Sequence, residues 1–158
     1  MSETRLDRVF TFGDQLSFLI PHEWIEADEE SNAYLYHAPH ADSGWLRVSL
    51  ITVKDLKTSC RDRLLGFLKE RARKESGELY ESGENIVVAW ERPSEQDGVL
   101  LYLYWWSVGH CHGSSLAREA MFSYTILRER RDDPDTQSTV SLIAELVANS
   151  RFTEPKIV

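Results

Sequence analysis

The stretch Gly98 to Gly109, GVLLYLYWWSVG, is the longest apolar run of the chain and decides its fold. Successive side chains of a strand point to opposite faces, and here both alternating sets are apolar. A strand that is apolar on both faces is usually covered on both faces. The run therefore predicts the central strand of an antiparallel sheet that is covered on each side.

Two further strands, Asn85–Arg92 and Leu116–Arg128, are expected to flank this run. A loop over 93–97 and a second loop over 109–115 connect the three. The expected cross-strand pairs are Val88 with Tyr102, Trp90 with Leu100, Tyr102 with Tyr124, Tyr104 with Phe122, and Trp106 with Ala120. Strict alternation on paired strands predicts a buried aromatic face.

The opposite face of these strands is apolar in the middle and polar toward one edge. Its expected members are Val87, Ala89, Leu101, Leu103, Trp105, Met121, Ser123 and Thr125. Such a face is either covered by a helix or partly open as a groove. Because Trp and Met are enriched where proteins meet, we take Leu101, Leu103, Trp105 and Met121 as the candidate partner surface.

Four strands are expected before the first helix: Val9–Phe12, Leu16–Ile20, Ala33–His37 and Trp45–Val53. In the first hairpin the expected pairs are Phe12 with Leu16 and Phe10 with Phe18, and in the second Tyr36 with Leu46 and Tyr34 with Val48.

Apolar residues at helical spacing predict two helices. The first, which Ser59 or Thr58 can cap, runs to about Glu75, and the second runs from about Asp135 to Asn149. The expected order is β-β-β-β-α-β-β-β-α, an α+β fold with about seven strands in a single antiparallel sheet and a helix on each face. We expect one domain over 1–158, with 1–7 and 153–158 as frayed ends.

Composition narrows the possible functions. The chain has 158 residues and a net charge of −8, which disfavours non-specific binding to nucleic acid or to an anionic membrane surface. No segment reaches the ~20 apolar residues of a membrane span, and the N-terminus has no apolar stretch typical of a signal peptide. The expected address is the cytoplasm, with Cys60 and Cys111 reduced.

Three short motifs resemble the PsbP-like superfamily: F-x-x-x-L-S-F-x-I-P-x-x-W (Phe12 to Trp24), L-R-V-S (Leu46 to Ser49) and L-V-A-N-S-R-F (Leu146 to Phe152). That group includes the extrinsic photosystem PsbP proteins, a Ran-binding nuclear-transport factor and bacterial DcrB-type proteins. The resemblance implies an α/β/α sandwich that binds a protein partner without catalysis. Some bacterial relatives resemble chaperones of secreted effectors. No functional residue of a member matches a position of this chain.

His110-Cys111-His112 is the sharpest local feature that could carry chemistry. On a strand the two histidines project to one side, as two metal ligands could, but zinc needs one or two more. We favour the interpretation of this motif as a polar hairpin turn between two glycines, so we assign no metal and no cofactor. The sequence has no nucleophile elbow, P-loop or dinucleotide fingerprint, and we expect no enzyme activity.

Two hypotheses follow. The first is a non-catalytic bacterial module that binds another protein or a second copy of itself, in the manner of a chaperone or adaptor of a secretion or toxin system. The second is a small-molecule or metal-binding protein, or a cryptic enzyme, with a site near His110 and His112.

Overall fold

The computed structural model of the chain describes residues 5–27, 32–39, 43–53, 59–113 and 116–153. Its strands and helices are β1 (Leu6–Thr11), β2 (Leu16–Pro21), β3 (Ile25–Ala27), β4 (Ala33–His37), β5 (Trp45–Val53), α1 (Cys60–Glu75), β6 (Glu78–Ser82), β7 (Asn85–Gln96), β8 (Val99–His112), β9 (Leu116–Leu127), the 3-10 turn η1 (Arg128–Arg130), α2 (Pro134–Ala148) and β10 (Arg151–Phe152).

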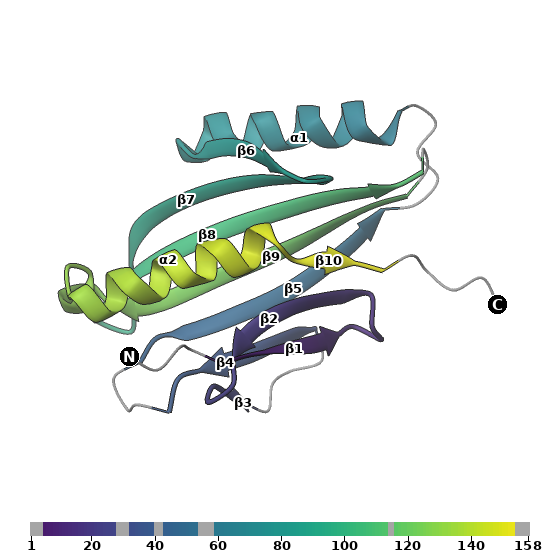
Figure 1. The fold of residues 1–158 in the computed structure, drawn as a ribbon. Helices are drawn as coiled ribbons and strands as arrows, with labels where there is room; N and C mark the ends of the chain where they lie inside the picture. The colour runs from purple at the N-terminus through teal and green to yellow at the C-terminus, as the bar shows by residue number, and fades with distance from the viewer. Residues whose placement is uncertain (1–4, 28–31, 40–42, 54–58, 114–115, 154–158) are drawn as a thin grey trace.

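The predicted fold class is confirmed. A seven-stranded antiparallel sheet in the order β3-β4-β5-β9-β8-β7-β6 forms the middle layer, with α1 and α2 on opposite faces (Figure 1). The first hairpin does not join this sheet as expected. It forms a separate three-stranded sheet, β1-β2-β10, that packs on the same face as α2.

The predicted aromatic face is the main core. Tyr102, Tyr104, Trp106, Phe122 and Tyr124 are all buried, and they pack with Ile143 and Val147 of α2 and Phe18 of β2. The expected β8–β9 register is off by two residues, because Tyr104 lies opposite Tyr124 and Trp106 opposite Phe122. A shift of two keeps every side chain on its expected face.

The expected register of β7 is wrong by an odd number of residues, which exchanges its two faces. Trp90 lies opposite Trp105, and Val88 opposite Ser107. As a result Val87 and Ala89 face the aromatic core, while Trp90 points to the α1 side. The cause is the connection. Residues 93–96 continue the strand, and the turn is the pair Asp97-Gly98, both with positive φ (52° and 80°).

The first hairpin is also displaced by one residue from the expected register. Val9 lies opposite Phe18, and Thr11 opposite Leu16. Phe12 has φ 54° and belongs to the turn, and Phe10 points outward with 58% of its surface exposed. The second hairpin has the predicted register, with Tyr36 opposite Leu46.

Some residues at both ends of the chain that were expected to be frayed are held by the fold. Residues 6 and 7 belong to β1, and the Thr153 amide donates a hydrogen bond to the Gln15 carbonyl at 2.9 Å. The rest of the predicted C-terminal tail, 154–158, lies outside the described residues. Strands β3, β6 and β10, with at most five residues each, were not predicted.

Candidate binding face

Helix α1 covers only part of the second face of the main sheet. Ser59 caps its first turn by accepting a hydrogen bond from the Asp62 amide at 3.5 Å. Leu64 and Leu68 then pack on Ile86 and Val88 in a small second core. The helix lies mainly against β6, β7, β8 and β9, and Ile25 of β3 and Trp45 of β5 are exposed (Figure 1).

The register carries one row of side chains across six strands on this face. Residues that lie directly opposite one another in neighbouring strands point to the same side of the sheet. The row consists of Ile25, His37, Trp45, Thr125, Leu103 and Arg92. Ile25 and Trp45 are 47% and 44% exposed, so the row is open to solvent at its β3–β5 end.

A shorter row beside it contains Ser94, Leu101 and Leu127, and Val99 follows Leu101 on the same side of β8. Leu127 is 40% and Val99 46% exposed. We call the apolar members of the two rows and Val99, together with Trp105, the open face: Ile25, Trp45, Val99, Leu101, Leu103, Trp105 and Leu127.

The four candidate partner residues lie on the face that the sequence predicted. Leu101, Leu103 and Trp105 belong to the open face, and Met121 lies opposite Ser107, closer to α1. All four are partly buried, so the face is partly covered and partly open. Sequence reasoning missed Trp45 and Ile25, because their place in the row follows from the β5–β9 pairing of distant segments.

Trp90 and Trp105 mark the border between the covered and the open part. Their rings stack at 5.9 Å with an interplanar angle of 5°. Both indole Nε1 groups are buried and have no hydrogen-bond partner in the described part of the chain. Buried donors without a partner are uncommon in folded proteins, so a partner that covers this border could accept hydrogen bonds from both indoles.

His110 and His112 lie on the opposite face, beside β10. Their rings are 4.6 Å apart, and His110 stacks on Phe152 at 5.1 Å. The Asn85 amide donates to the Ser150 carbonyl at 2.8 Å, which directs Asn85 Oδ1 toward Nδ1–H of His110 at 3.0 Å. Burial, and then His112, lower the pKa of His110.

The same cluster contains Arg118, which is 1% exposed. Its guanidinium donates to the Thr153 carbonyl and lies 3.4 Å from His112 Nε2. These contacts tie the C-terminal segment to the sheet. Among the described residues no group of three His, Cys, Asp or Glu side chains could hold a metal ion, so the structure offers the two histidines no third ligand there.

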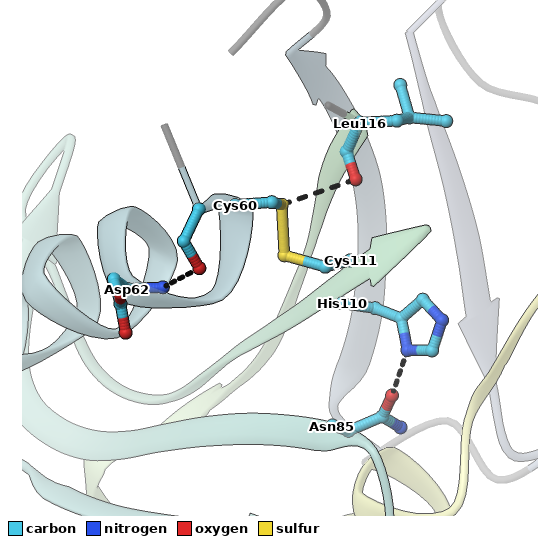
Figure 2. The surroundings of a disulfide bond; sticks show 7 residues. Cys60, Asp62, Asn85, His110, Cys111 and Leu116 are labelled. Atoms are coloured by element: carbon cyan, nitrogen blue, oxygen red, sulfur yellow. Dashed lines mark hydrogen bonds between the residues drawn. A yellow bond between two sulfur atoms is a disulfide. The ribbon is translucent and has the colours of Figure 1, made fainter. Parts of the chain in front are cut away.

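Cys60 and Cys111 form a disulfide, and the expectation of two reduced thiols is wrong (Figure 2). The bond joins the first residue of α1 to the end of β8, across 51 residues of sequence. Cys60 is 1% exposed, and its sulfur lies 3.4 Å from the Leu116 carbonyl. The bond therefore fixes the start of α1 over the sheet.

Comparison with known proteins shows the fold and no more. No family model and no curated protein sequence matches the chain. A solved structure of the protein LpqN, described as involved in cell envelope biogenesis of Mycobacterium tuberculosis, matches with 13% identity and a TM-score of 0.63, over 97% of this chain and 93% of LpqN. A protein from Bacteroides thetaiotaomicron matches with 17% identity and a TM-score of 0.62, over 93% of this chain; the chain spans 48% of that protein.

A further match is the cyanobacterial PsbP protein CyanoP of Synechocystis, with 15% identity, a TM-score of 0.40, and 96% and 95% of the two chains covered. At these identities the similarity concerns the fold alone, and the two matches above 0.6 carry it. These two matches support the predicted α+β fold, and the match to CyanoP adds no argument. Among the described residues no helix has the length and apolar character needed to cross a membrane.

Proposed function

We propose that the protein is a non-catalytic binding module that holds a protein partner on the open face. The observation that carries this proposal is the exposure of apolar side chains on the open face: Ile25 and Trp45 lie at one end of the longer row, and Leu127 and Val99 lie in and beside the shorter one. Large contiguous apolar surfaces on soluble proteins commonly mark interaction sites. Trp is also the residue type that most often dominates interface energies.

The polar surroundings of the open face fit a protein partner. Arg92 and Thr125 lie in the same row as Leu103, and Ser94 lies beside Leu101. An apolar centre with polar groups at its margin is the usual anatomy of a protein interface. The partner is a second protein or a second copy of this chain. A role as chaperone or adaptor of a bacterial secretion or toxin system is the finer form of the proposal, which the genes next to this one would test.

Variants of exposed residues test the proposal without disturbing the core. Trp45→Glu and Leu127→Glu place a charge on the open face, and Phe10→Glu is the matched control, since Phe10 is exposed to 58% on β1. Cross-linking in the native host, followed by affinity purification and mass spectrometry, identifies the partner. Sedimentation velocity of each purified variant measures self-association.

We expect the first two variants to lose the partner or the dimer and Phe10→Glu to keep it. Truncating an interface Trp commonly costs about 2 kcal/mol or more, which is about thirtyfold in affinity. A strictly monomeric wild type that captures no specific protein would refute the proposal, and so would a partner retained equally by all three variants.

We further propose that the protein works in an oxidising compartment, such as the cell envelope, rather than in the cytoplasm expected from the sequence. The support is the Cys60–Cys111 disulfide, since disulfides persist in oxidising compartments and are rare in the cytosol. Trapping free thiols in intact cells with a maleimide reagent tests this proposal. Both cysteines should resist labelling until a reductant is added; labelling of both without reductant would refute it.

A further inference from the structure

An apolar groove of about 350 Å³ runs between α1 and the ends of β5 and β9, apart from the open face. Leu64 and Ala117, which are 7% and 8% exposed, lie at its base. Phe67 from α1 and Ile51 from β5 form its two sides, and they are 50% and 56% exposed. A volume of this size lies at the lower end of small-molecule pockets.

Within the described part of the chain, no side chain covers the exposed halves of Phe67 and Ile51. Phe67 belongs to the apolar positions that helical spacing assigns to the buried side of α1, yet half of it faces solvent. Ile51 lies opposite Glu119 and follows the part of β5 that pairs with β4. The two side chains flank the groove, so a ligand within it would cover both.

Three arginines line the groove, and two of them are engaged: Arg118 points to the opposite face and donates to the Thr153 carbonyl, and Arg71 pairs with Glu119, which leaves Arg63. Arg71 lies 3.3 Å from Glu119, its guanidinium covers the Phe67 ring at 5.0 Å, and Glu119 also accepts from Ser107 at 2.8 Å. That pair is neutral as a whole. Arg63 lines the groove one helical turn before Phe67, and within the described residues no carboxylate forms an ion pair with it.

We propose that this groove binds a single-chain amphipathic anion, whose aliphatic chain lies between Phe67 and Ile51 and whose carboxylate meets Arg63. Apolar sides complement the chain, and the uncompensated guanidinium complements a carboxylate. The net charge of −8 disfavours an anionic bilayer as the source of the ligand, so the occupant is one free amphiphile. This site is independent of the protein partner on the open face.

Calorimetric titration of the disulfide-bonded protein with decanoate, below its micellar range, tests the proposal. Octyl glucoside and decylammonium serve as neutral and cationic probes. We expect saturation at one equivalent of decanoate, weaker binding of octyl glucoside and no measurable binding of decylammonium. Decylammonium binding as tight as decanoate, or heat that never saturates, would overturn the proposal.

Three variants and a control locate the ligand. Ile51→Asp and Phe67→Ser should weaken decanoate by about tenfold or more, since each removes apolar area from the groove. Arg63→Gln should weaken decanoate about fivefold, as expected for an exposed charge pair, and leave octyl glucoside unchanged. Phe10→Ser, at an equally exposed site on β1, should match the wild type.

All four positions are exposed, so circular dichroism should show an unchanged fold. Wild-type affinity in both Ile51→Asp and Phe67→Ser would place decanoate elsewhere and refute the site. Binding to sedimented vesicles containing phosphatidylglycerol without binding to free decanoate would refute a single free amphiphile. Neither outcome bears on partner capture by the Trp45 and Leu127 variants, so the two proposals fail separately.

Discussion

A β-carbon placed on Gly109 would lie 2.7 Å from Cδ1 of Leu64, so α1 packs on β8 at a position where any larger residue forces a leucine of α1 to move. Leu68 Cδ1 would lie at 2.9 Å from the same atom. We predict that Gly109→Ala destabilises the protein by about 1–3 kcal/mol, the usual cost of overpacking a core. Urea denaturation measures the difference.

Gly66 of α1 provides the opposite case. A β-carbon there meets nothing within 4 Å, and the residue is exposed inside the helix. Gly66→Ala should therefore stabilise the protein by about 1 kcal/mol, the difference in helix propensity between the two residues. If Gly109→Ala and Gly66→Ala change the stability in the same direction, the lack of a side chain at Gly109 is not required for the packing of α1 on β8.

The Cys60–Cys111 bond closes a segment that contains all of α1, β6 and β7. We predict that the double variant Cys60→Ser/Cys111→Ser is less stable by about 4 kcal/mol, from the loop-closure entropy of a segment of this length. Guanidinium denaturation of the oxidised wild type, the reduced wild type and the double variant measures it. The double variant should be insensitive to reductant, and an oxidised wild type no more stable than the reduced one would contradict the prediction.

How far the sequence predicts this structure depends on how far apart the interacting residues lie along the chain. The pairing of Tyr36 with Leu46 follows from a local pattern and was predicted, and the helix cap is Ser59, one of the two candidates Ser59 and Thr58. The Cys60–Cys111 bond was not, because nothing local indicates that the start of α1 lies over the end of β8. The Trp45 to Leu103 row likewise depends on pairing β5 with β9, which are far apart in sequence.

The error in β7 has a different origin, because the correct signal was present in the sequence. Asp-Gly between apolar runs is a strong indication of a two-residue hairpin, and Asp97-Gly98 forms one. Residues 93–97 were instead assigned to a loop, because the segment is rich in turn-forming residues. The longer loop then shifted the β7–β8 register by an odd number of residues and assigned Trp90 to the wrong face.

The buried imidazole of His110 makes stability depend on pH. Burial and the neighbouring His112 and Arg118 lower its pKa, while Glu84 acts in the opposite direction. In the unfolded chain the pKa is about 6.5, so below that value the unfolded state binds a proton that the folded state does not. The contribution of neutral His110 to the free energy of unfolding is therefore present in full above pH 6.5. It is lost as the pH falls toward the lower pKa that His110 has in the folded protein.

Urea denaturation of the wild type and His110→Gln at pH 7.5, 6.0 and 5.0 checks this sign. We expect the wild type to lose more stability than the variant between pH 7.5 and 5.0, because glutamine does not titrate. Parallel loss in both proteins would assign the acid sensitivity to other groups.

Pro93 is accommodated in β7 because its backbone nitrogen faces away from β8. The residues that flank a two-residue hairpin turn, here Gln96 and Val99, form a hydrogen-bonded pair. Hydrogen-bonded and non-hydrogen-bonded pairs alternate along an antiparallel ladder, so Ser94 and Arg92 also bond toward β8 and Pro93 does not. Pro93 therefore lies on the outer edge, where β6 pairs only as far as Ala89 and no described strand continues. Because Pro93 has no N–H on this edge, no hydrogen bond between β7 and β8 is lost. The missing donor also interrupts an edge that could otherwise pair with another chain.

We predict that Pro93→Thr restores this donor and raises self-association above the wild-type level, through pairing of the exposed edge. Light scattering after size-exclusion chromatography at increasing protein concentration measures it. Ser94→Thr is the matched control, since it adds the same β-branched side chain where the N–H already bonds toward β8. Equal association of the two variants would show that Pro93 does not protect the edge.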